Sequence, residues 1–167
     1  MKGQKVLITG SNGFLGKKLR IFLEKNDFFV IATGLGKDRL LHHNHIYHKL
    51  DITSFKECAY VLNKYNPSVL INAAAFTYVD ECEKNKNKCL EINTNSLDCL
   101  IPYLLKHNIH LVQISTDFVF DGMKGSYVEN DICDPVNFYG FSKLKAENKI
   151  INSELSMYTI LRTSLLY

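Results

Sequence analysis

The sequence predicts an α/β fold, a doubly wound parallel sheet with helices on both faces. Short apolar segments rich in β-branched residues alternate with amphipathic segments of helical period along most of the chain. Glycine, proline and polar residues separate the two kinds of segment. Because parallel strands need crossover connections, this alternation indicates a parallel sheet with right-handed crossovers.

The first three elements form a βαβ unit. The apolar run Lys5–Thr9 indicates a buried strand, and Phe14–Lys25 has the period of an amphipathic helix. The second strand, Phe28–Thr33, is rich in aromatic and β-branched residues.

The next three elements repeat the alternation. Ile46–Leu50 predicts a short third strand, and Ser54–Tyr65 a helix capped by the Ser54 hydroxyl. Ser68–Asn72, directly after Pro67, predicts the fourth strand.

The second half predicts two more helices and two more strands. A long helical pattern covers Lys86–His107 and is followed by a strand at Ile109–Ser115. A helix at Phe138–Asn152 and a strand at Met157–Thr163 complete the sheet. The polar stretch Asp117–Asn137 is long for a loop inside a compact domain, and such loops are usually functional.

Composition excludes several classes of protein. With 167 residues, 46% hydrophobic and 22% charged, the chain has the size and balance of one globular domain. A net charge of +3 is too small to indicate a nucleic-acid partner. No apolar run is long enough for a signal peptide or a membrane span, so we expect a cytoplasmic protein without a membrane partner.

Neither the cysteines nor the histidines form a metal-binding pattern. Five cysteines without a CxxC pair indicate reduced thiols rather than a disulfide framework or a zinc site. The spacing of His42, His43, His45 and His48 does not match a known zinc motif. We therefore expect no metal.

A glycine-rich turn joins the first strand to the first helix. Gly10 would allow the tight turn, Gly13 would admit a pyrophosphate close to the backbone, and Gly16 would let the helix pack near the strand. The helix N-terminus would then face the anion. Ser11 and Asn12 would either donate to phosphate oxygens or cap the helix. The turn predicts a Rossmann-like dinucleotide site.

Two positions bear on the adenosine end of the dinucleotide. The acid that normally binds the ribose is displaced or missing after the second strand, where Lys37 and Arg39 offer cations for a ribose phosphate. This favours NADPH over NADH, unless the segment is an ordinary charged loop. Asp51 would either accept from the adenine amino group or cap the following helix.

The fourth and fifth strands end in small or hydroxyl side chains. Asn72–Ala75 would let the backbone approach a flat ligand, unless it is simply a tightly packed strand end. Ser115 and Thr116 could bind the oxygen of a carbon that receives hydride. Because strand ends converge on one crevice, Thr116 can meet Tyr139 there.

Tyr139 and Lys143 are four residues apart on a predicted helix and so share one face. A nearby ammonium favours phenolate, so we expect Lys143 to lower the pKa of Tyr139 from about 10. Tyr139 could then exchange a proton with a carbonyl. The alternative is a solvated lysine over a half-buried ring.

Three segments resemble an extended short-chain dehydrogenase/reductase, specifically the dTDP-4-dehydrorhamnose reductase family: Asn72–Asp80, Ile114–Gly122 and Pro135–Leu144. The resemblance implies NAD(P)-dependent reduction of a 4-keto-6-deoxy nucleotide sugar in dTDP-rhamnose biosynthesis. It implies that Tyr139 is the acid, that Lys143 lowers its pKa and binds the nicotinamide ribose, and that Thr116 holds the substrate oxygen. Phe118 and Phe141 depart from the residues common in this family, although neither replaces a reacting group.

The resemblance and the turn together give one expected cofactor site, with NADP(H) favoured and NAD(H) as the alternative. Asn93 matches a helix asparagine of the family that shapes the site rather than reacting. The expected partners are the nucleotide sugar and a second copy of the chain in a homodimer. The expected cofactor-binding residues are Gly10, Ser11, Asn12, Gly13, Phe14, Leu15, Gly16, Lys37, Asp51, Ile52, Ala73, Ala74, Ala75, Thr77, Asn93, Ser115, Tyr139 and Lys143.

The resemblance also leaves alternatives open. Residues 1–167 would form the NAD(P)-binding domain and lack the C-terminal substrate-binding region of the family, so this length of chain could be inactive. One rival is a non-catalytic regulatory subunit like that of methionine adenosyltransferase. Another is a nucleotide-sugar epimerase or dehydratase.

Overall fold

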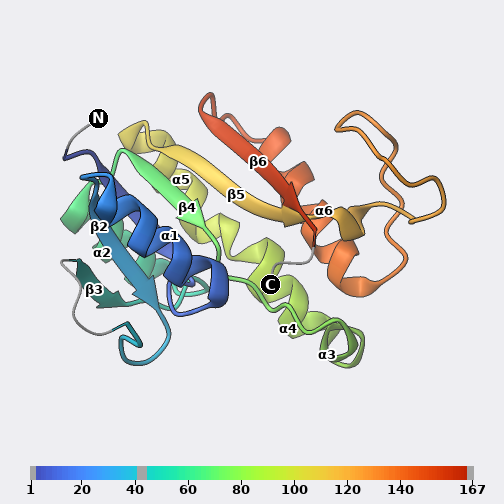
Figure 1. The fold of residues 1–167 in the computed structure, drawn as a ribbon, viewed down its shortest axis with the longest axis horizontal. Coiled ribbons are helices and arrows are strands. Elements are labelled where there is room, and N and C mark those ends of the chain that lie inside the picture. Colours follow the sequence, from blue (N-terminus) through green and yellow to red (C-terminus); the bar gives the residue numbers. More distant parts are fainter. Residues whose placement is uncertain (1–2, 41–44, 165–167) are drawn as a thin grey trace.

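The protein folds around a six-stranded, wholly parallel sheet in the order β3-β2-β1-β4-β5-β6 (Figure 1). The structure, a computed structural model, describes residues 3–40 and 45–164. This order and the crossover helices make the fold Rossmann-like, as predicted. The strands are β1 Lys5–Thr9, β2 Phe29–Gly34, β3 Ile46–Lys49, β4 Val69–Asn72, β5 His110–Thr116 and β6 Tyr158–Thr163.

The helices cover the two faces of the sheet unequally. Alternate strand residues point to opposite faces, so Leu7 lies with the core under α2, α5 and α6, whereas Val6 and Ile8 lie with the smaller core under α1. The helical segments are α1 Phe14–Lys25, α2 Phe55–Tyr65, α3 Val79–Lys84, α4 Lys86–Leu90, the π-helix η1 Glu91–Asn95, α5 Leu97–His107, the 3₁₀-helix η2 Asp117–Val119 and α6 Phe138–Ile151.

The predicted helix Lys86–His107 is wrong as a single element. It consists of α4, the π-helical turn η1 and α5. The wider turn directs the buried side chains of Asn93 and Thr94 toward α6, where both bond to Ser142. A π-turn inside a helix often marks a functional site.

Most other predicted elements are confirmed within one residue at each end. The Ser54 hydroxyl accepts a hydrogen bond from the Glu57 amide, as predicted for the N-cap of α2. The short helix α3 was not predicted as a separate element. The predicted loop Asp117–Asn137 begins with η2.

The larger core yields a stability prediction. Leu104 of α5 is fully buried, whereas its neighbour Leu105 is 39% exposed. We expect Leu104→Ala to lower the free energy of unfolding by about 3 kcal/mol, because it leaves a cavity that the packed helices cannot fill. Leu105→Ala is the control and should cost less than about 1 kcal/mol. Urea unfolding followed by circular dichroism measures both, and equal losses would contradict the assigned core.

Candidate active site

The glycine turn presses closely against the segment that follows β4. Gly10 has φ of +63°, and a Cβ atom there would lie 2.7 Å from the Ala73 carbonyl oxygen and from the Ala74 nitrogen. A Cβ at Gly16 would lie 2.6 Å from Ser11 Cα. Both positions therefore require glycine, for the tight turn and the close packing that were predicted.

The N-terminus of α1 is suited to an anion. Gly13 is its N-cap and supplies no side-chain hydrogen bond, and the first turn holds no acidic residue. Neither the cap residue nor the first turn of α1 therefore places a negative charge at the positive end of the helix. The Ser11 hydroxyl beside it is buried without a hydrogen-bond partner. An open helix end and an orphaned donor fit a dinucleotide pyrophosphate.

The Asn12 side chain links the glycine turn to the segment after β2. Its Nδ2 donates to the Lys37 carbonyl and to the Tyr47 hydroxyl, both at 3.0 Å. Its Oδ1 accepts from the Arg39 amide at 3.0 Å. Asn12 does not cap α1, because Gly13 is the N-cap and that helix has no side-chain cap.

The other predicted cofactor-binding residues near the turn are more exposed to solvent. The Phe14 side chain is exposed, and Leu15 is partly buried. The side chains of Lys37 and Arg39 are exposed on the segment that Asn12 holds. They are placed where an anion could approach the end of β2.

Asp51 and Ile52 serve local structure. Asp51 Oδ1 accepts from the Thr53 amide at 2.9 Å and from its hydroxyl at 2.7 Å, which forms a turn before α2. Ser54, not Asp51, caps that helix. The Ile52 side chain lies in the larger core, so any contact between Ile52 and a cofactor would come from its backbone.

Asn93 positions the strand end that follows β4. Its Oδ1 accepts from the Phe76 amide at 2.7 Å, and its Nδ2 donates to the Phe76 carbonyl at 3.0 Å and to the Ser142 hydroxyl at 2.9 Å. The Asn93 side chain is buried, and its bonds fix the backbone of Phe76. Ala73–Ala75 are half-buried beside it, and Thr77 is exposed.

The structure brings Thr116 and Tyr139 together, as predicted. Thr116 ends β5, and Tyr139 lies in the first turn of α6, whose N-cap Asn137 accepts from the Gly140 amide at 2.8 Å. Burial raises the pKa of Tyr139, although a hydrogen bond with the Thr116 side chain opposes the shift. The Phe118 ring packs edge-on against Tyr139.

The predicted direction of the Tyr139 pKa shift was wrong in this structure. The reason is twofold: the phenol is desolvated, and the Lys143 amine donates to the Ile114 carbonyl at 2.6 Å. Lys143 is itself buried, and burial lowers its pKa from 10.5 to about 8, with Glu147 opposing the shift. In this arrangement both groups shift toward their neutral forms.

Glu147 and Arg162 complete this part of the site, and neither was predicted. Glu147 lies one turn after Lys143 and is buried. Arg162 of β6 donates to Glu147 from NH2 at 2.7 Å and from Nε at 3.1 Å. The Ser115 hydroxyl, predicted to bind the substrate oxygen or the cofactor, donates to Glu147 in this structure. The four-residue spacing from Lys143 to Glu147 was the available signal.

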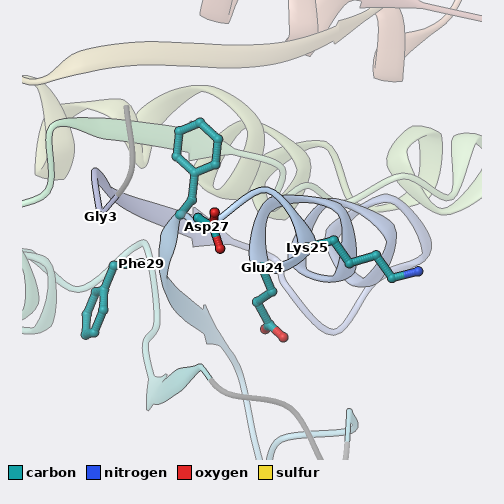
Figure 2. Close-up of a pocket in the computed structure, with 6 residues that line it drawn as sticks. Gly3, Glu24, Lys25, Asp27 and Phe29 are labelled. Carbon is teal, nitrogen blue, oxygen red and sulfur yellow. The ribbon is translucent and has the colours of Figure 1, made fainter.

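Other features lie outside this site. A pocket of about 420 Å³ lies at the opposite edge of the sheet, where β1 and β2 begin, and is lined by Gly3, Glu24, Lys25, Asp27, Phe28 and Phe29 (Figure 2). In residues 3–40 and 45–164 no helix is long and apolar enough to cross a membrane.

The same two ranges hold no cluster of three metal-ligating side chains. His42 and His43 lie outside the described residues. All five cysteines are free thiols.

Two curated relatives align with nearly all of the chain. The dTDP-4-dehydrorhamnose reductase of Aggregatibacter actinomycetemcomitans is 34% identical over 162 residues, which is 96% of this chain and 51% of that protein. The methionine adenosyltransferase 2 subunit beta of Bos taurus is 28% identical over 164 residues, 98% of this chain and 47% of that protein. The chain spans about half the length of these relatives.

A solved structure and a family model give the same assignment. The dTDP-4-dehydrorhamnose reductase of Bacillus anthracis, solved in complex with NADP, is 33% identical with a TM-score of 0.84, covering 100% of this chain and 55% of that one. The family model described as RmlD substrate binding domain matches residues 4–167. The chain therefore belongs to the RmlD substrate binding domain family.

Proposed function

We propose that residues 1–167 form the coenzyme-binding and proton-donating part of an NADPH-dependent reductase of a 4-keto-6-deoxy nucleotide sugar. One observation carries the proposal: the open N-terminus of α1 and the Thr116–Tyr139 pair both lie at the carboxyl edge of the same parallel sheet. The dTDP-4-dehydrorhamnose reductases to which the chain is similar support the substrate class. The free cysteines agree with a cytoplasmic location.

The turn Gly10–Gly16 would hold the pyrophosphate, and Ala73–Ala75 would lie along the dinucleotide. Lys37 and Arg39 would meet a ribose phosphate. When bound, reduced nicotinamide would supply the hydride.

Tyr139 would supply the proton. Because burial raises its pKa, the phenol is protonated near neutral pH, which is the state that a donor to a carbonyl oxygen requires. The Thr116 hydroxyl would bind the same oxygen and orient it. The buried Lys143 ammonium, one helical turn away, would stabilise the phenolate that this proton transfer leaves.

A regulatory subunit is the second candidate. The similarity to the methionine adenosyltransferase beta subunit favours it, as does the bond of Lys143 to the Ile114 carbonyl instead of Tyr139. Such a protein would bind the coenzyme without oxidising it. Following the absorbance of NADPH with a panel of nucleotide keto sugars separates the two candidates.

Removing the Tyr139 hydroxyl tests the assigned acid. We expect Tyr139→Phe to lower the rate of NADPH oxidation by about two to four powers of ten, because general acid catalysis is lost. Binding of NADPH by calorimetry should change less than about threefold. Tyr60→Phe, which removes a half-exposed phenol on α2, is the matched control. Unchanged turnover in Tyr139→Phe would refute the assignment of the acid.

The burial of Lys143 should make stability depend on pH. Between the folded pKa of about 8 and the unfolded value of 10.5, the unfolded chain holds a proton at Lys143 that the folded chain lacks. Stability therefore rises with pH across this window, and the cost of the buried ammonium is full below it. Relative to Lys143→Met, wild-type protein should gain about 3 kcal/mol from pH 7.5 to pH 10.5.

Urea unfolding at several pH values measures this difference. Lys145→Met, on the exposed side of α6, is the control and should follow the wild-type pH dependence. If the difference in unfolding free energy between wild type and Lys143→Met did not vary with pH, the assignment of Lys143 as a buried ammonium would be wrong.

A further inference from the structure

Arg20 of α1 is fully buried, although it takes no part in the proposed chemistry. Its NH2 group donates to both carboxylate oxygens of Asp38, at 2.8 and 2.9 Å. Its NH1 group donates to the Ser11 carbonyl at 3.4 Å, which ties the pair to the glycine turn. Its Nε is buried without a partner. Burying a guanidinium costs solvation free energy, and this guanidinium lies beside the proposed coenzyme site.

Asp38 lies where an acid of a dinucleotide site is expected. It follows Gly16 by about 20 residues, the spacing at which a carboxylate usually binds the adenosine ribose of NADH. Asn12 bonds to the Lys37 carbonyl and the Arg39 amide, so the residues on both sides of Asp38 are held against the turn. An acidic residue is therefore present in this segment, but Asp38 lies beyond Gly34, the last residue of β2.

The Asp38 carboxylate is engaged by side chains of the chain itself. It accepts from Arg20 and contacts His45 at 2.7 Å, and His45 also pairs with Glu24 at 2.8 Å. Burial tends to raise the pKa of Asp38, but hydrogen bonds from His45, the Leu40 amide and Arg20 outweigh it, so the group stays ionised. Its charge is compensated by the buried guanidinium.

The two flanking cations are not compensated in this way. Lys37 and Arg39 have exposed side chains, and neither forms an ion pair within the described ranges. With Asp38 paired to Arg20, the segment presents net positive charge beside the turn. A phosphate on the adenosine ribose would be attracted there, whereas a free Asp38 carboxylate would repel it.

We propose that Arg20 determines the preference for NADPH by holding the Asp38 carboxylate away from the ribose. This inference rests on the proposed function and adds a specificity-determining residue to it. Arg20 acts through Asp38, so it is a positioning residue and need not touch the coenzyme.

The test measures the dissociation constants of NADPH and NADH by calorimetry. Wild-type protein should bind NADPH more tightly. In Arg20→Met, which keeps the buried aliphatic volume, the ratio of the NADH to the NADPH dissociation constant should fall about tenfold, because the Asp38 carboxylate loses the guanidinium that compensates its charge. The adenosine fragments 2′,5′-ADP and 5′-AMP should show the same change, since they differ in the ribose phosphate.

A second variant separates this mechanism from simple disruption. Arg20→Met with Asp38→Asn removes both charges, so the ratio should return to within about threefold of wild type. A loop that was merely disturbed by Arg20→Met would not recover. If Arg20→Met does not fold, Asp38→Asn by itself tests the inference. This variant should keep the preference for NADPH. A selective loss of NADH binding in Asp38→Asn would overturn the inference.

Lys149→Met is the matched control, because it removes a cation from a distant ion pair with Asp98 and should leave the ratio unchanged. Wild-type protein that binds neither coenzyme would overturn both the proposed function and this inference. A wild-type preference for NADH, or a ratio unaffected by Arg20→Met, would overturn the inference alone.

Discussion

Buried polar side chains at the carboxyl edge of the sheet bond to one another across the strands, and these bonds organise the edge. The Thr9 hydroxyl donates to Asn72 Oδ1 at 2.6 Å, and Asn72 Nδ2 donates to Gln113 Oε1 at 2.8 Å, so one chain of hydrogen bonds crosses β1, β4 and β5. The Thr9 hydroxyl also accepts from the Ala74 amide at 3.2 Å. These bonds hold the β4 strand end against Gly10, because an unsatisfied group here would be costly.

Two partly buried ion pairs lie near the two ends of this edge. Arg20 and Asp38 meet beside β2, and Glu147 and Arg162 meet between α6 and β6. A buried ion pair contributes little net stability, because desolvation offsets the attraction, but losing one partner is strongly destabilising. Such pairs are therefore better explained by the orientation they impose on nearby segments.

Local signals in the sequence predicted the parallel fold and the glycine turn, because strand alternation, helical period and positive φ depend on neighbouring residues. The break inside Lys86–His107 was not predictable, since the π-turn is set by distant bonds from Asn93 to Phe76 and Ser142. The meeting of Thr116 with Tyr139 followed from topology. The Arg20–Asp38 pair could not be predicted from topology, because helix period alone cannot identify the partner of a buried charge.

The Tyr139 shift shows why spacing alone misjudged the electrostatics. A lysine four residues away suggests a stabilised phenolate, but burial acts on both side chains and opposes charge on each. The outcome depends on the neighbouring charges and hydrogen bonds. Glu147 favours the ammonium of Lys143 and so opposes the effect of burial. Ser115 of β5 and Arg162 of β6 both donate to the Glu147 carboxylate, so the group that favours the charged amine is held in place from two neighbouring strands.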